Sequence, residues 1–214
     1  MNWKLIPKDT TPKPTNGSCY SDWKQEIAEE GFHQCVYCSI SEKAFGGIRN
    51  FHIEHYKPKS KFPELRDEFS NLFYSCSICN CFKGNDWPNE PTKDLSSISY
   101  PKPSKINYKN LFVVNTKDGR IDGKNIAASY MIEKLFLNRP QLILERKHQI
   151  IFDKIWSSLD IINEQKKELY NRISTKQEEV VTFLKAIDSL VKQILDLIKV
   201  SENVSPYKLS QIKR

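Results

Sequence analysis

The 214-residue sequence lacks long apolar runs, and its first residues do not resemble a secretory signal. Its uninterrupted hydrophobic stretches are only a few residues long, whereas a helix that spans a membrane needs about 20. The N-terminal residues contain neither an apolar core nor a small-residue cleavage site, so we expect no secretion. The expectation is a cytoplasmic protein that makes no membrane contact.

Glycine is also scarce, with seven residues, and this excludes a collagen-like chain. Charged residues make up 28% and hydrophobic residues 39%, which is typical of a globular protein and not of a disordered one. The net charge of +7 is unevenly placed, because residues 101–150 hold ten basic and four acidic residues. A basic middle suits a nucleic-acid partner better than a membrane surface, although a solvated surface rich in lysine has the same composition.

Cysteine is present in an informative pattern. The six cysteines are Cys19, Cys35, Cys38, Cys76, Cys79 and Cys81. Four of them form two Cys-x-x-Cys pairs with 37 residues between the pairs, and in a chain without a signal peptide such pairs indicate metal ligands rather than disulfides. The two pairs would complete a tetrahedral, structural Zn²⁺ site. Cys81 could replace either Cys76 or Cys79; otherwise Cys19 and Cys81 are ordinary thiols.

The first half of the chain predicts short elements around these pairs. An extended or loosely docked arm over residues 1–20 precedes a short helix that ends near Gly31. The elements expected next are a half-buried hairpin strand within residues 48–56, a short helix opened by the second cysteine pair, an irregular crossing over residues 85–107, and a strand with a turn over residues 111–119.

After residue 124 the sequence pattern becomes helical. Apolar residues recur at helical spacing, break near residues 138–140, and resume from Leu142 to about Ile173 and again from Val180 to Ile198. This predicts two or three long helices that form an antiparallel hairpin. We interpret the apolar stripe as core packing, with a partner-binding face as the alternative.

The segment between and after the cysteine pairs carries residues suited to metal-dependent chemistry. His55 is a candidate general base at neutral pH. Glu54 and Asn80 offer oxygen atoms of the kind that hold Mg²⁺ or Mn²⁺. Adjacent strand residues point to opposite faces, so Glu54 and His55 share a site only if the strand ends or twists there. The lysines that could bind nucleic-acid phosphates are Lys57, Lys59, Lys61 and Lys83.

This arrangement resembles the HNH endonucleases of the ββα-metal class, in their zinc-knuckle form, over about residues 31–84. The shared pattern is Glu54-His55, then Asn71, then Cys76-x-x-Cys79-Asn80 with Lys83 three residues on. The resemblance implies that Glu54 and Asn80 hold a catalytic Mg²⁺ or Mn²⁺ and that His55 activates water. It implies that Asn71 braces the hairpin loop and orients His55. Asparagine in the last position makes the chain an H-N-N variant.

A second likeness, from Gly119 to Arg146, is to stand-alone, defence-associated HNH proteins, which include the Septu-type nuclease that works beside an ATPase. The predicted fold class is α+β and mostly helical, with a zinc-stapled ββα-metal HNH core followed by a long C-terminal helical hairpin. The predicted domains are an N-terminal arm and short helix over residues 1–30, the HNH core over residues 31–90, and a helical domain for partner docking over residues 91–214.

The function predicted from these resemblances is a metal-dependent HNH endonuclease that hydrolyses phosphodiester bonds in DNA, in anti-phage defence with a partner ATPase. The alternative is a non-catalytic, zinc-stabilised module for nucleic-acid binding or assembly. The adjacent Glu54 and His55 argue against that alternative, because a pure binder has no use for a carboxylate beside phosphate. The helical half would dock the ATPase or form a homodimer.

Overall fold

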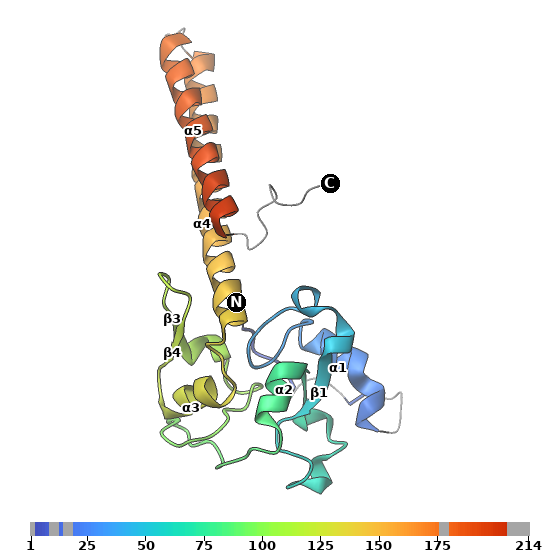
Figure 1. Cartoon of the computed structure of the whole chain (residues 1–214). Coiled ribbons are helices and arrows are strands. Elements are labelled where there is room, and N and C mark those ends of the chain that lie inside the picture. Colours follow the sequence, from blue (N-terminus) through green and yellow to red (C-terminus); the bar gives the residue numbers. More distant parts are fainter. Residues whose placement is uncertain (1–2, 9–12, 15–18, 176–179, 205–214) are drawn as a thin grey trace, which may run out of the picture. The chain divides into compact units, whose positions relative to one another are not determined.

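A computed structural model describes residues 3–8, 13–14, 19–175 and 180–204. The chain divides into two units, Met1–Glu145 and Arg146–Arg214. The described part of the first unit combines helices with two small antiparallel sheets, and that of the second is helical (Figure 1). The predicted α+β class is therefore confirmed, whereas the predicted domain boundaries stay predictions. No described helix is long and apolar enough to cross a membrane.

The centre of the first unit is a hairpin of β1 (Phe51–His55) and β2 (Leu72–Cys76), in which Phe51 lies opposite Cys76 and His55 opposite Leu72. Every residue of β2 is buried, so both faces of this strand are covered. β1 is shorter than the predicted strand segment because Ile48–Asn50 form a 3-10 turn before it.

The helix α2 (Ser77–Lys83) follows β2 directly and contacts β1, which completes the predicted ββα arrangement (Figure 1). The sulfur of Cys76 caps α2 by accepting a hydrogen bond from the Cys79 amide. The helix ends at Gly84, whose φ of +50° is a left-handed conformation that glycine adopts easily. The expectation that the second cysteine pair opens a short helix is confirmed.

Buried and exposed residues are mixed in the described N-terminal segment. Trp3 is buried, and its indole Nε1 donates a hydrogen bond to the carbonyl of Tyr37 at 2.9 Å. Lys8 is buried as well and forms an ion pair with Glu30, the last residue of α1 (Lys24–Glu30). Residues 3–8 form no helix or strand, as predicted for an extended arm, but the contacts of Trp3 and Lys8 hold this segment against the rest of the unit. Residues 1–2, 9–12 and 15–18 of the predicted arm lie outside the described residues.

The residues after α2 pack onto the hairpin through tyrosine hydroxyls. Tyr100 and Tyr130 both donate to Oδ2 of Asp86, the first at 2.7 Å. The hydroxyl of Tyr56, directly after β1, donates to the carbonyl of Tyr100 at 2.7 Å. These bonds explain how an irregular crossing without regular elements from residue 85 to 107, as predicted, still has a defined position.

A second hairpin and a helix complete the first unit. β3 (Phe112–Val114) pairs with β4 (Ile121–Gly123), which confirms the predicted strand near residue 111. α3 (Ile126–Lys134) follows, and the side chain of Asn125 caps it by accepting a hydrogen bond from the Ala128 amide at 2.9 Å.

The two longest helices are α4 (Pro140–Thr175) and α5 (Val180–Val204). α4 begins at Pro140, because proline has no amide hydrogen to lose in the first turn of a helix. Figure 1 shows α5 running in the opposite direction to α4, as predicted for a helical hairpin. Several large apolar side chains on these helices are exposed, namely Phe152, Trp156, Ile161, Val191 and Leu195.

Candidate metal centre and active site

The four predicted zinc ligands meet in one place. The Sγ atoms of Cys35, Cys38, Cys76 and Cys79 lie within 4.8 Å of one another, and all four residues are buried. Tetrahedral Zn²⁺ with Zn–S bonds of about 2.3 Å requires sulfur atoms about 3.8 Å apart. The Cys38 and Cys76 sulfur atoms are 3.8 Å apart. The four cysteines therefore fit a structural zinc ion, which would join the first cysteine pair to the β2–α2 junction.

The two remaining cysteines lie outside this cluster. Cys81 is exposed on α2, so it does not replace Cys76 or Cys79 among the clustered thiols. Cys19 is half-buried, and its sulfur lies 2.8 Å from the hydroxyl of Ser21. The ambiguity in the ligand set that the sequence left open is thereby resolved.

An arginine lies against the clustered sulfur atoms. Nη2 of Arg139 donates to the Sγ atoms of Cys38 and Cys79 at 3.7 Å and of Cys76 at 3.9 Å. Burial lowers the pKa of Arg139, but the Cys79 and Cys38 sulfur atoms outweigh burial and raise the pKa overall. Four thiolates around Zn²⁺ leave two negative charges uncompensated, and the guanidinium would offset one of them.

Glu54 is buried on β1 and is paired with Lys83 of α2. The Lys83 ammonium lies 2.6 Å from Oε1 of Glu54 and donates to the carbonyl of His55 at 3.0 Å. The Tyr37 hydroxyl donates to the same Glu54 oxygen at 3.2 Å. Burial raises the pKa of Glu54, and the Lys83 ammonium opposes that rise. The Lys83 side chain has no exposed surface, so its predicted contact with nucleic acid is corrected to a buried ion pair.

His55 ends β1, and its side chain has different neighbours from Glu54, as strand alternation requires. Its Nε2 lies 2.9 Å from the carbonyl oxygen of Arg66, which can only accept, so we assign the ring proton to Nε2 and a lone pair to Nδ1. Burial lowers the pKa of His55, the bond to Arg66 opposes this, and the Lys59 ammonium lowers the pKa further. The imidazole is therefore neutral near pH 7.

Asn71 holds the loop between β1 and β2 at both ends. Its Nδ2 donates to the carbonyls of Lys57 at 3.0 Å and Leu65 at 3.2 Å, and its Oδ1 accepts from the Lys57 amide at 2.8 Å. Since Arg66 follows Leu65 directly, these bonds also fix the segment whose carbonyl holds His55. Asn71 is thus linked to His55 through the loop that it holds. Its role in catalysis stays a prediction.

The three loop lysines differ in their surroundings. Lys57 forms an ion pair with Glu90 at 2.6 Å, and Lys61 donates to the carbonyl of Trp87 at 3.3 Å. Lys59 is exposed, and its ammonium donates to the hydroxyl of Tyr20 at 2.8 Å. No contact within the fold tests whether these three lysines bind phosphate. Their predicted contacts with phosphate therefore stay predictions.

Asn80 lies on α2 one turn before Lys83 and is half-buried. The contacts of Glu54 with Tyr37 and Lys83 both use Oε1. Glu54 and Asn80 each carry side-chain oxygen atoms, and an all-oxygen donor set fits Mg²⁺ or Mn²⁺. That the two side chains bind one ion together with water stays a prediction.

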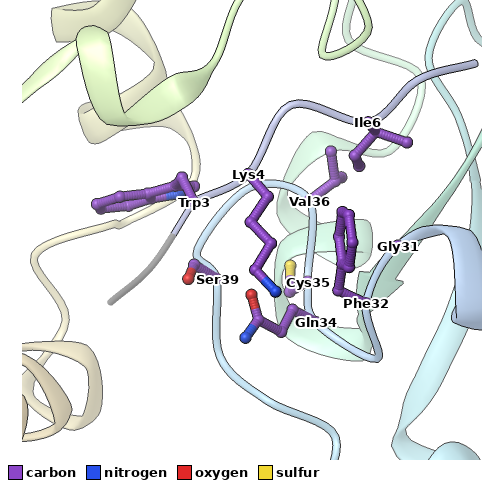
Figure 2. A pocket seen from close by; sticks show the side chains of 9 residues that line it. All are labelled: Trp3, Lys4, Ile6, Gly31, Phe32, Gln34, Cys35, Val36 and Ser39. Atoms are coloured by element: carbon purple, nitrogen blue, oxygen red, sulfur yellow. The ribbon is translucent and has the colours of Figure 1, made fainter.

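A small pocket lies between the N-terminal segment and the first cysteine pair, as Figure 2 shows. Trp3, Lys4, Phe32 and Cys35 are among the side chains that line it. Glu54, His55 and Asn80 are not part of its lining, and we therefore assign this pocket no part in the chemistry.

Comparisons with known proteins agree with this geometry. The family model described as HNH endonuclease matches residues 35–86, from the first cysteine ligand to three residues beyond α2. These residues are an HNH endonuclease domain. The chain is also similar to the Septu protein PtuB of Bacillus thuringiensis, with 29% identity over 119 residues. The similar region covers 54% of this chain and 41% of that protein, so the chain spans less than half of its relative. The predicted resemblances are thus confirmed, the second at modest identity.

Proposed function

We propose that this protein is a metal-dependent endonuclease that hydrolyses phosphodiester bonds. The observation that carries the proposal is the hydrogen bond from His55 to the Arg66 carbonyl, which leaves Nδ1 as the ring atom able to take a proton from water. A neutral, oriented imidazole is the state that a general base needs at neutral pH. The HNH endonuclease domain at residues 35–86 supports the same reaction.

In this proposal each site residue has one task. Nδ1 of His55 takes the proton of the attacking water, and Asn71 keeps the loop that orients His55 in place. Glu54 and Asn80 would hold Mg²⁺ or Mn²⁺, and such an ion, when bound, stabilises the charge on the phosphate and on the leaving oxygen. The four cysteines and their zinc take no part in the chemistry, and they hold the hairpin and α2 together.

The proposed substrate is DNA, which the resemblance to HNH endonucleases favours and which the basic segment 101–150 suits. Similarity to a Septu protein supports a role in anti-phage defence with a partner ATPase. Exposed apolar side chains such as Trp156 and Val191 would contact that partner or a second copy of the chain. A site of four free thiols suits the reducing cytoplasm.

The test is nicking of supercoiled plasmid by the full chain with Mg²⁺, with Mn²⁺, or with no added divalent cation. We expect nicking only with the added cation, and we expect His55→Ala to slow it by about 10²–10⁴-fold. His52→Ala is the matched control, because His52 lies on the same strand and is exposed. Zinc content should be unchanged in both variants. Nicking by His55→Ala at the wild-type rate would contradict the proposed base.

A second candidate function is a zinc-stabilised nucleic-acid-binding module without catalysis. The ion pair of Glu54 with Lys83 favours it, because the ammonium already neutralises the carboxylate that would hold the catalytic cation. This candidate predicts that the wild-type chain binds DNA but leaves plasmid intact with either cation.

A further inference from the structure

Tyr20 lies outside the matched HNH domain, in a 3-10 turn over Tyr20–Trp23, yet it contacts the proposed base. Its ring meets the imidazole of His55 edge-on, with ring centroids 4.7 Å apart. Two cations lie over the same ring, the Lys59 ammonium at 4.8 Å and the Arg66 guanidinium at 5.6 Å from its centroid. One aromatic side chain thus joins His55 to two basic residues of the β1–β2 loop.

The position of Tyr20 is fixed by the same short segment that orients His55. The Tyr20 amide donates to Oδ1 of Asp67 at 2.9 Å, while the carbonyl of the preceding Arg66 holds the imidazole. The Tyr20 hydroxyl accepts a hydrogen bond from Lys59 at 2.8 Å. Main-chain and side-chain contacts therefore fix the positions of three groups relative to one another. These groups are the Tyr20 ring, the His55 imidazole and the Lys59 ammonium.

We propose that Tyr20, Lys59 and Arg66 form a phosphodiester-binding platform beside His55. The proposal rests on the proposed function, since it gives the nuclease a place for the phosphate next to the scissile bond. Lys59 and Arg66 are both exposed, so their charges can meet a phosphate without a change of fold. Asp67 lies 3.9 Å from Nε of Arg66 but cannot neutralise two cations, so the platform stays positively charged.

The other loop lysines have different partners, which distinguishes Lys59 from them. Lys57 is paired with Glu90, and Lys61 donates to the Trp87 carbonyl, so both point toward the segment after α2. Lys59 alone of the three contacts an aromatic ring that also touches His55. Tyr20 is a positioning residue in this proposal, because it acts by aligning Lys59 and not by contacting the reacting atoms.

The first experiment measures binding without cleavage. A fluorescein-labelled 20-bp DNA duplex is titrated with the full chain by fluorescence anisotropy, at several NaCl concentrations and without divalent cation. We expect Lys59→Gln and Arg66→Gln each to weaken binding and to reduce the slope of log K against log [NaCl] by about one. The matched control is Lys43→Gln, an exposed lysine of the 3-10 turn Lys43–Phe45 outside the basic segment 101–150, which should keep the wild-type slope. A wild-type slope in both platform variants, or an equal loss in the control, would overturn the platform.

The second experiment tests the role of Tyr20. Tyr20→Phe removes the hydroxyl that holds Lys59 and keeps the ring, so the fold should be preserved, and circular dichroism checks this. We expect Tyr20→Phe to weaken DNA binding, and we expect the double variant with Lys59→Gln to bind no more weakly than Lys59→Gln alone. Fully additive losses would show that Tyr20 does not act through Lys59.

Failure of this inference can be told from failure of the proposed nuclease function. If the wild-type chain nicks plasmid with Mg²⁺ while the platform variants bind DNA normally, only the platform is wrong. If the wild-type chain leaves plasmid intact and the platform variants lose binding, the platform stands as part of a DNA-binding protein and the nuclease proposal fails.

Discussion

Arg139 places a fixed positive charge against the sulfur atoms of three cysteines. A zinc tetrathiolate is negatively charged, and burial makes such a charge costly unless a cation is near. The guanidinium lies where it can offset part of the negative charge that the bound cluster would carry. Arg139 should therefore slow zinc release without itself binding the ion.

We predict that Arg139→Gln weakens zinc binding by about 10–100-fold, the usual effect of removing a residue that supports metal ligands. The measurement is competition with a chromophoric chelator. Arg120→Gln removes an exposed arginine from the same unit and serves as the control. Equal zinc affinities in the wild type and Arg139→Gln would contradict the assigned role.

The ion pair between Lys83 and Glu54 is buried, so removing one partner should destabilise the fold. Lys83→Met leaves the Glu54 carboxylate buried without its cation, so we expect the free energy of unfolding to fall by about 3–5 kcal/mol. Urea denaturation at pH 7 measures the change. Adding Glu54→Leu to this variant should restore most of the loss, because neither charge then remains buried. If the two substitutions lowered the free energy of unfolding by fully additive amounts, Glu54 and Lys83 would not act as a coupled pair.

Residues of the candidate site were predictable from the sequence only where their spacing is short or repeated. The Cys-x-x-Cys pairs and the Glu54-His55 step are local patterns, and the structure brings all four cysteines together. Tyr20 and Arg139 were missed because their contacts cross long sequence distances; Arg139, for example, is 101 positions from Cys38. Residues 138–140 indicated only a break between helices. Lys83 was misassigned because burial of a lysine cannot be read from its neighbours in sequence.

At the scale of elements, the junction of β2 and α2 depends on one residue. Cys76 ends β2, caps α2 through its sulfur, and belongs to the four-cysteine cluster. α2 has only seven residues, and an isolated helix of that length is not stable in water. The zinc site and the contact with β1 must therefore supply the stability that α2 lacks by itself.

We predict different results for two serine substitutions in and beside α2. Cys76→Ser removes a zinc ligand and should give a protein with little bound zinc and a lower melting temperature. Cys81→Ser changes an exposed thiol five residues further on and should match the wild type. Zinc analysis and thermal scanning of both variants measure this. A zinc-loaded, stable Cys76→Ser protein would contradict the structural role of the site.

Elements were predicted best where a local signal marks their ends. The break predicted near residues 138–140 lies where α4 begins, although helical periodicity was expected to resume only from Leu142, and the second cysteine pair marked the start of α2. The strand near residue 51 was predicted too long, because only the pairing with β2 sets its limits. The packing of the N-terminal residues was underestimated, since the bond from Trp3 to Tyr37 leaves no pattern in the sequence.

At the scale of the whole molecule, the four tryptophans report on different units. Trp3, Trp23 and Trp87 are buried in the unit Met1–Glu145, whereas Trp156 is exposed in the unit Arg146–Arg214. Helix content has the opposite distribution, because α4 and α5 have 36 and 25 residues while α1, α2 and α3 have seven, seven and nine. Tryptophan fluorescence therefore follows mainly the first unit, and circular dichroism at 222 nm follows mainly the long helices.

Zinc removal from the full chain should affect the first unit more than the second. The zinc ligands all belong to the first unit, so chelation should lower the melting temperature seen by tryptophan fluorescence more than the one seen by circular dichroism. Transitions that do not coincide mark units that unfold separately. The measurement is a thermal scan with both probes, before and after treatment with a zinc chelator, with re-added zinc as the control. If the two transitions coincided and shifted together, the chain would unfold as one cooperative unit and the division at residue 145 would have no thermodynamic meaning.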